Sequence, residues 1–323
     1  MSAKEKILRD NELNTVKPVE IRYPCLVGEQ SQLRRMVVLM TSFNRKQQTL
    51  ESLRILAAST GLEQVQMTAV LVDDGSTDGT ADAVRSLFPW VQVIVGDNNL
   101  FWCRGMHKAF EVAMRDNYDY YLWLNDDTLL YPDAVARLLE CEATLRQRQG
   151  RPVIVVGSTV DPVAGHLTYG GENQASKWRL TTFSRVVPSA APQRCDSMNG
   201  NLVLIPSMVA QATGNLDTAF EHAMGDTDYA LRTRRLGYEV WVAPGIFGTC
   251  GYNSPKGTYM DTSLSMYRRW KQMMSRKGLP WRSWLTLTRR HAGPLWFLYF
   301  GLPYIKLILG AYRIQPSKSE KHI

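Results

Sequence analysis

Short apolar segments alternate with segments of helical pattern along most of this chain, and this alternation constrains the fold more than any other feature. Runs that resemble buried strands occupy residues 36–40, 69–72, 91–95, 120–124, 153–156, 202–205 and 240–242. Patterns that favour a helix occupy residues 48–59, 80–87, 132–145 and 227–236. Such alternation predicts an α/β fold with a mostly parallel sheet flanked by helices.

The same pattern divides the 323 residues into three regions. Residues 1–34 show no clear periodicity and are expected to form an N-terminal extension. Residues 35–250 carry the alternation, interrupted at 161–197 by a segment rich in Gly, Ser, Thr and Pro that is expected to form an irregular excursion or a small hairpin. Residues 251–323 predict a helical, basic and aromatic C-terminal region. The charged first residues lack the apolar run of a secretory signal, so we expect the main domain to stay in the cytoplasm.

The C-terminal region carries the positive charge of the chain. No Asp or Glu occurs from 262 to 319, a stretch with eleven Lys or Arg, whereas the rest of the chain has a net charge of −3. A basic region on a mildly acidic body predicts an anionic partner: phospholipid, a lipid-linked diphosphate or nucleic acid. The aromatic residues among these charges fit a membrane interface at least as well as base stacking: Trp281, Trp284, Trp296, Phe297, Tyr299 and Phe300.

Residues 295–312 are nearly all apolar, but Gly301, Pro303 and Lys306 interrupt them. The segment is barely long enough to cross a bilayer. A transmembrane helix, an interfacial segment and a buried helix are therefore all compatible with it.

The first acidic motif follows the second predicted strand, at residues 72–80 (VDDGSTDGT). In an open α/β sheet, ligands bind at the carboxyl ends of the strands. A carboxylate at this position can accept hydrogen bonds from a nucleoside base or ribose. The alternative is a polar turn that only caps the next helix, since Asp, Ser and Thr commonly do so.

A second strand, at residues 122–128 (LWLNDDT), also ends in adjacent carboxylates. A diphosphate leaving group needs its charge neutralised, and a hard divalent cation held by one or two carboxylates does this. Two strands that both end in Asp-Asp predict acids along one edge of the sheet. The alternative is an ordinary turn between strand and helix.

A third acidic motif lies at residues 224–232 (MGDTDYALR), where a helix is expected to begin. An attacking hydroxyl must lose its proton, and a carboxylate at a helix start, near the metal, can accept that proton. The helix dipole favours the ionised carboxylate there. The alternative makes Asp226 a plain N-cap and pairs Asp228 with Arg232 on the surface.

In order and spacing, these motifs resemble the family-2 glycosyltransferases of the GT-A fold, particularly bacterial enzymes that build polysaccharides and other cell-surface glycans. The likeness begins at residues 40–45 (MTSFNR) and continues through 73–80, 100–106 (LFWCRGM) and 125–127 (NDD). It closes at 225–228 (GDTD) and so spans the region 35–250. A GT-A fold is a Rossmann-like nucleotide-binding sheet, which agrees with the predicted alternation.

The resemblance implies a role for each matching residue. Four residues are implied to surround the donor nucleoside, and one to contact the donor from a loop at 100–106: Thr41, Phe43, Arg45, Asp74 and Gly105. Asp126 is implied to lie near the ribose or donor sugar. Asp127, in a DXD-type motif, is implied to hold Mg²⁺ or Mn²⁺. Asp226 matches the family's catalytic base, which implies direct displacement with inversion at the anomeric carbon.

Two residues depart from the family pattern. Many relatives have a second acid immediately before the base, where this chain has Gly225. Many also carry a histidine metal ligand at the end of the strand after the base, where this chain has Cys250. Cys250 then either replaces that ligand as a softer donor, or leaves the metal to Asp127 and phosphate.

These features predict transfer of a sugar from a nucleotide diphosphate donor to a hydroxyl acceptor at the cytoplasmic face of a membrane. A lipid-linked acceptor accounts for both the acidic motifs and the basic C-terminal region, and Gly200 and Asn201 are expected to line the sugar pocket. One alternative is a sugar nucleotidylyltransferase, but residues 41–48 lack the glycine-rich loop that would hold a triphosphate. Another is a non-catalytic module that binds nucleotide sugar or membrane, which retention of all three acidic motifs disfavours.

Overall fold

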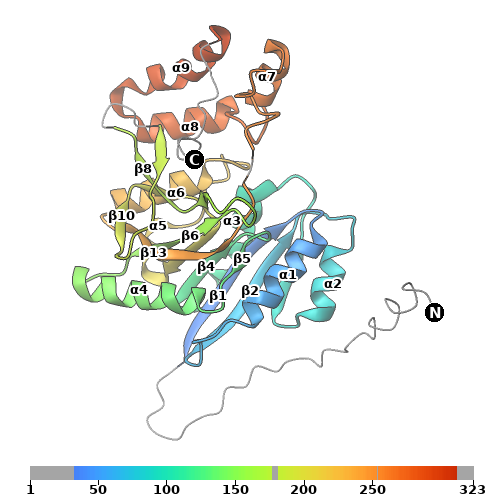
Figure 1. Cartoon of the computed structure of the whole chain (residues 1–323), viewed down its shortest axis with the longest axis vertical. Helices are drawn as coiled ribbons and strands as arrows, with labels where there is room; N and C mark the ends of the chain where they lie inside the picture. Colours follow the sequence, from blue (N-terminus) through green and yellow to red (C-terminus); the bar gives the residue numbers. More distant parts are fainter. Residues whose placement is uncertain (1–32, 177–180, 253, 311–323) are drawn as a thin grey trace, which may run out of the picture.

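The computed structural model describes residues 33–176, 181–252 and 254–310. Nearly all of the extension predicted at 1–34 lies outside these residues, and the first strand already begins at Arg34. The fold is α/β, with a central, mostly parallel sheet flanked by helices, as the sequence predicts (Figure 1). Across the sheet the strands follow the order β10 (Gln193–Cys195), β13 (Val240–Thr249), β6 (Ile154–Val160), β12 (Leu202–Pro206), β4 (Tyr120–Leu124), β1 (Arg34–Ser42), β2 (Val65–Asp73) and β3 (Val91–Val95).

The strand register brings the acidic motifs to one edge of this sheet. β1 is parallel to both β2 and β4, and Ser42 at the end of β1 pairs with Asp73 at the end of β2. β12 runs antiparallel to β4, and Leu202 at its start pairs with Leu124 at the end of β4. The residues that follow β1, β2 and β4, and those that precede β12, therefore lie along the same edge.

Alternating side chains of β1 divide the core between the two faces of the sheet. Met36, Val38 and Met40 pack into one buried cluster, and Val37 and Leu39 pack into the other. The first cluster is covered by helices α1 (Lys46–Ala57), α2 (Thr80–Leu87) and α4 (Ala134–Gln149), and the second by α3 (Phe101–Ala113), α5 (Ser207–Thr213) and α6 (Gly225–Arg235). Each fully buried aliphatic side chain contributes about 1.5–3 kcal/mol to this packing.

Most predicted elements are present, and three have the predicted bounds: α2, β3 and β4. Helix α4 begins two residues later than predicted, because Pro132 lies in the preceding turn, where its carbonyl accepts a 2.8 Å hydrogen bond from the N–H of Thr60. The prediction of a loop at 100–106 is wrong. Helix α3 begins at Phe101, since Cys103, Met106 and Phe110 form an apolar face at helical spacing that packs on the sheet.

The excursion at 161–197 forms short antiparallel strands, which agrees with the hairpin alternative and not with an irregular loop. β7 (Leu167–Tyr169) pairs with β6. A separate three-stranded sheet has the order β11 (Ser197–Met198), β8 (Gly171–Gln174) and β9 (Phe183–Arg185). Within it Ser197 lies opposite Glu172, so both side chains lie on the same face of this small sheet.

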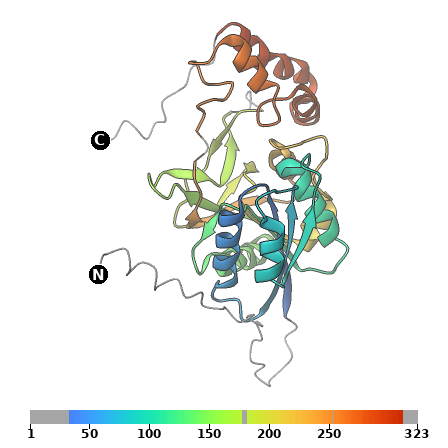
Figure 2. The same cartoon turned by 90° about the vertical axis from the view of Figure 1, so that its right-hand side faces the viewer.

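The C-terminal region forms helices α7 (Met266–Met273), α8 (Trp281–His291) and α9 (Trp296–Ile308), which gather at one end of the molecule (Figure 1, Figure 2). Trp284 of α8 is buried in the same cluster as α3 and α6. Its indole N–H donates a 3.1 Å hydrogen bond to the carbonyl of Phe300, which ties α9 to α8. Within the described residues, no helix has both the length and the apolar character needed to cross a bilayer.

Candidate active site

Side chains of the first acidic motif accept hydrogen bonds from backbone N–H groups at the starts of three helices. The carboxylate of Asp74 is buried and accepts hydrogen bonds from the N–H groups of Leu100 (3.0 Å) and Phe101 (2.9 Å) at the start of α3. Asp78 accepts hydrogen bonds from the N–H groups of Thr80 (3.0 Å) and Lys46 (2.9 Å), at the starts of α2 and α1. Asp78 thus has the turn and capping role considered for this motif, and Asp74 fixes the N-terminus of α3.

Asp126 and Asp127 in the second motif converge on one cationic atom. Nη1 of Arg45 lies 3.1 Å from Oδ1 of Asp126 and 2.7 Å from Oδ2 of Asp127. Asp126 is buried, with 7% of its side chain exposed, whereas 32% of the Asp127 side chain is exposed. Burial raises the pKa of Asp126 to about 6, the positive charge of Arg45 opposes this shift, and the charge of Asp127 adds to it.

These carboxylates have the donor chemistry that a hard divalent cation requires. Oδ2 of Asp126 is buried and has no hydrogen-bond partner among the described residues. Nowhere in the described residues is a group of three or more His, Cys, Asp or Glu arranged to hold a metal ion. Mg²⁺ is commonly held by one or two carboxylates together with phosphate oxygens and water. The carboxylates present therefore have the chemistry to hold such an ion together with phosphate and water.

Trp102 joins the second motif to the start of β12. Its indole N–H donates a 2.7 Å hydrogen bond to Oδ1 of Asn125. A Cβ added at Gly200 would overlap the Trp102 ring, so only glycine allows this close approach. The N–H of Asn125 also donates a 3.0 Å hydrogen bond to the carbonyl of Asn201. Asn125 therefore orients both Trp102 and the backbone that leads into β12.

The third motif places Asp226 at the second position of helix α6. Its Oδ2 accepts a 3.0 Å hydrogen bond from the N–H of Gly200, and Oδ1 accepts a 2.8 Å hydrogen bond from the N–H of Thr227. Met224, and not Asp226, is the N-cap residue, so the alternative of a plain N-cap is wrong. Burial raises the pKa of Asp226, and the two N–H donors partly offset that rise.

Asp228 and Arg232 do form an ion pair, but its predicted place on the surface is wrong. The Asp228 side chain is 0% exposed, and Nε of Arg232 lies 2.8 Å from its Oδ2. The same carboxylate also contacts α8 of the C-terminal region. Asp228 therefore belongs to the interior of the molecule.

The helices that carry these motifs begin with unfavourable backbone conformations. Phe101, the first residue of α3, has φ 55°, and Met224, the N-cap of α6, has φ 73°. Large side chains rarely adopt this left-handed region, which costs on the order of 1–3 kcal/mol per residue. The guanidinium of Arg276 lies over the Phe101 ring at 4.2 Å from its centroid. Strain of this kind concentrates at functional sites.

The other predicted donor-binding residues lie along the same edge. Thr41 is the penultimate residue of β1, and a Cβ added at Gly105 would overlap its Oγ1. Phe43 directly follows β1 and is 43% exposed. Gly105 therefore allows α3 to pack directly against the end of β1, beside Phe43 and Arg45.

The model of glycosyl transferase family 2 matches residues 37–180 of the chain. Residues 37–180 therefore form a family-2 glycosyltransferase domain. The match covers Thr41, Asp74 and both carboxylates of the second motif, and it ends before Asp226. It supports glycosyltransferase activity over the alternative of a sugar nucleotidylyltransferase. A search of curated proteins finds no match to the chain.

The glycosyltransferase has no room for an acid at residue 225. A Cβ added at Gly225 would overlap Sγ of Cys103, which is fully buried in α3. Where many relatives carry a second acid, this chain therefore has a glycine, which allows the close contact between α6 and α3.

Glu172 is a carboxylate of the site that our sequence reasoning missed. It lies on β8, and Nδ2 of Asn199 donates a 3.4 Å hydrogen bond to its Oε1. Burial raises the pKa of Glu172 to about 7, and the negative charge of Asp226 adds to the rise. The chain thus has a second acid near Asp226, supplied by the excursion. Because Glu172 and Asp226 are far apart in the sequence, no local pattern of residues indicates that they lie close together.

Proposed function

We propose that this glycosyltransferase moves a sugar from a nucleotide diphosphate sugar to a hydroxyl acceptor by metal-assisted direct displacement, with inversion and with Asp226 as the base. Family membership implies a nucleotide-sugar donor and an acceptor. The metal, the base and the stereochemical course are what the resemblance to the family implies, and the contacts of this chain's own residues support the first two.

A chain of contacts from the second motif to the third carries this proposal. Sγ of Cys250 lies 3.5 Å from Oδ1 of Asp127, and Nδ2 of Asn201 lies 3.5 Å from the same Sγ. Gly200, which immediately precedes Asn201 in the chain, donates its N–H to Asp226. Three contacts thus connect the proposed metal ligand to the proposed base, which supports a single site formed by both.

Asp226 suits the removal of a proton from the acceptor. As the acceptor oxygen bonds to the anomeric carbon, the bond from that carbon to the diphosphate oxygen breaks, and the hydroxyl proton passes to the Asp226 carboxylate. The nucleoside diphosphate leaves with the bonding electron pair. A pKa raised above the usual aspartate range makes the ionised Asp226 carboxylate a stronger proton acceptor.

Asp127 is proposed to hold Mg²⁺ or Mn²⁺, and Asp126 beside it is proposed to lie near the ribose or donor sugar. When bound, the ion neutralises charge on the diphosphate group. Arg45 adds a positive charge beside the same carboxylates, 43% of its side chain being exposed. Its position suits contact with an anionic donor.

The donor nucleoside is proposed to lie over the ends of β1 and β2. Thr41, Phe43 and Asp74 lie at this edge, and Gly105 keeps α3 close to it. Since both oxygens of Asp74 accept backbone N–H groups, this carboxylate supports the backbone beside the proposed nucleoside site in addition to any contact with the base or ribose. Gly200 and Asn201 are proposed to line the sugar pocket.

Helix α9 is proposed to dock the enzyme peripherally at the inner face of a membrane, near a lipid-linked glycan acceptor. Seven apolar residues in and around α9 are exposed: Leu295, Phe297, Leu298, Leu302, Ile305, Ile308 and Leu309. Arg282 lies over the ring of Trp281, 5.3 Å from its centroid, and Lys306 is exposed on α9. An exposed apolar helix with cationic neighbours and no acidic residue complements an anionic phospholipid surface.

A donor screen tests the enzymatic part of the proposal. Release of UDP, GDP and dTDP from their sugar conjugates is measured with Mn²⁺ and with EDTA, and we expect release only with metal. Asp226→Asn is expected to lower the rate by at least ~100-fold. Asp82→Asn, which changes an exposed carboxylate on α2, is the matched control and should keep the rate. Equal activity of Asp226→Asn and the unmodified enzyme would remove the proposed base.

A further inference from the structure

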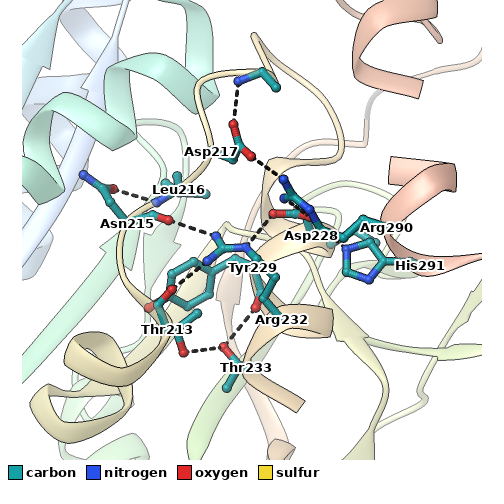
Figure 3. A network of polar contacts seen from close by, with 12 residues as sticks. Thr213, Asn215, Leu216, Asp217, Asp228, Tyr229, Arg232, Thr233, Arg290 and His291 are labelled. Atoms are coloured by element: carbon teal, nitrogen blue, oxygen red, sulfur yellow. Dashed lines mark hydrogen bonds and ion pairs between the residues drawn. The ribbon is translucent and has the colours of Figure 1, made fainter. Parts of the chain in front are cut away.

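The buried carboxylate of Asp228 receives three side-chain donors from two parts of the chain. Nε of Arg232 lies 2.8 Å from Oδ2, and Nη1 of Arg290 and Nε2 of His291 lie 2.7 and 2.8 Å from Oδ1. Arg232 belongs to α6, whereas Arg290 and His291 are the last residues of α8 (Figure 3). Asp228 thus connects the helix of the proposed base to the C-terminal region.

The protonation states of Asp228 and His291 favour the hydrogen bond between them near neutral pH. Burial alone would raise the pKa of Asp228, but hydrogen bonds from His291 and Arg232 and the charge of Arg232 lower it below its usual value. Burial lowers the pKa of His291, so the neutral imidazole donates to an ionised carboxylate near neutral pH. The two arginines supply the compensating charge, and 29% of the Arg290 side chain remains exposed.

The helical geometry places Asp226 and Asp228 on nearly opposite sides of α6, because two residues correspond to about 200° of rotation. Asp226 points to Gly200 at the start of β12. Asp228 points to α8. A change in the contact with α8 therefore tilts or turns the helix that carries Asp226.

The loop that leads into α6 is held by the same region. Nη2 of Arg290 lies 2.7 Å from Oδ2 of Asp217, and Oγ of Ser283 donates a 2.8 Å hydrogen bond to the carbonyl of Ala219. On its other side, the loop contacts α3, where the N–H of Cys103 donates a 3.0 Å hydrogen bond to the carbonyl of Glu221. Residues 214–224 thus lie between α3 and the C-terminal region.

Arg232 extends the network toward the start of this loop. Its Nη1 and Nη2 donate 2.7 and 2.9 Å hydrogen bonds to the carbonyls of Thr213 and Asn215 (Figure 3). With Nε on Asp228, the guanidinium holds α6 and the loop in one fixed geometry. The rigid unit therefore includes the loop, α6 and the end of α8.

We propose that Arg290 and His291 are positioning residues for Asp226. They fix α6 through Asp228 and the preceding loop through Asp217, so that helix α8 of the C-terminal region belongs to the catalytic unit. This inference rests on the proposed role of Asp226 as the base. Misplacement of a reacting group by about 1 Å typically lowers a rate by ~100-fold, so a small shift of α6 is sufficient to be measured.

The experiment compares Arg290→Gln, Arg290→Lys and His291→Gln in the full chain. Arg289→Gln is the matched control, because Arg289 is exposed and its guanidinium lies over the Trp296 ring, 5.5 Å from the centroid. We measure kcat for release of nucleoside diphosphate from the donor that the screen finds active. Affinity for the nucleoside diphosphate with Mn²⁺ is measured by calorimetry, and thermal melting shows the folded fraction at the assay temperature.

We expect Arg290→Gln and His291→Gln to lower kcat by ~10- to 100-fold while nucleotide affinity stays within about twofold of the unmodified enzyme. Arg290→Lys should recover part of kcat, and Arg289→Gln should keep it. Unchanged kcat in folded Arg290→Gln and His291→Gln, with Asp226→Asn inactive, overturns the positioning role and leaves the base intact. Parallel loss of kcat and nucleotide affinity also overturns it, since it indicates a structural role only. Full activity of Asp226→Asn instead removes the proposed function itself.

Discussion

The thiol of Cys250 lies 3.5 Å from Oδ1 of Asp127, although 123 residues separate them in the chain. Cys250 directly follows β13, where many relatives carry a histidine metal ligand. Burial raises the pKa of this thiol to about 12, and the negative charge of Asp127 adds to the rise. The thiol thus stays protonated and can donate to the carboxylate.

We expect Asp127, and not Cys250, to determine the response to metal. Asp127→Asn removes a charge from the proposed metal site and should lower the Mn²⁺-dependent affinity for nucleoside diphosphate by at least ~10-fold. Cys250→Ser keeps a hydrogen-bond donor of similar size. It should change this affinity by less than about threefold, because a hard cation is not expected to use the sulfur of Cys250 as a ligand. Calorimetric titrations with Mn²⁺ and with EDTA measure both effects. A larger loss in Cys250→Ser than in Asp127→Asn would contradict this assignment.

The pH dependence of the rate should contain two rises. One rise reports ionisation of Asp226: the base is active above its raised pKa and inactive below it, so the rate falls as the pH decreases through that value. The other reports Glu172, whose ionisation near pH 7 adds negative charge beside Asp226 and strengthens it as a proton acceptor. Glu172→Gln should remove the rise near pH 7 that belongs to Glu172 and keep the rise that belongs to Asp226. Profiles of kcat/KM for the two proteins decide this, and identical profiles would exclude Glu172.

Gly225 should tolerate no side chain. Gly225→Ala adds a Cβ that overlaps Sγ of the buried Cys103, and we expect the free energy of unfolding to fall by ~1–3 kcal/mol. Cys103→Ala in the same chain removes Sγ and should recover part of this loss. Gly251→Ala is the control, since its added Cβ meets no atom of the described residues within 4 Å. Urea denaturation measures all of these variants, and an unaltered midpoint for Gly225→Ala would refute the close contact.

Vesicle binding should depend on the exposed face of α9. Phe297→Glu and Leu298→Glu each replace an exposed apolar side chain by a carboxylate, at 53% and 54% exposure. We expect each to weaken binding to phosphatidylglycerol vesicles by ~10-fold or more, because burial of such a side chain in lipid is worth about 1.5–3 kcal/mol. Val163→Glu is the matched control, since Val163 is 95% exposed on the α/β body.

Sedimentation with phosphatidylglycerol and with phosphatidylcholine vesicles separates charge from apolar contact. Stronger binding of the unmodified enzyme to phosphatidylglycerol is expected, from the basic residues around α9. Equal binding of all three variants and the unmodified enzyme would show that α9 does not contact lipid.

The sequence by itself determined the α/β fold, the order of the acidic motifs, and their place at the ends of two strands and the start of a helix. These properties are local: an apolar run, the carboxylates that follow it and a helical period are each visible within about ten residues. Asp74, Asp126, Asp127 and Asp226 could be selected in this way. The helix at Phe101 was missed, although its apolar spacing was visible, because the motif was interpreted as a loop.

Only the tertiary structure decided which of these residues meet. Strand register places Cys250 beside Asp127, the excursion contributes Glu172 near Asp226, and α8 provides Arg290 and His291 to a buried Asp228. Such contacts join residues tens to more than a hundred positions apart. They depend on packing and on the burial of charge, which no local pattern of residues records.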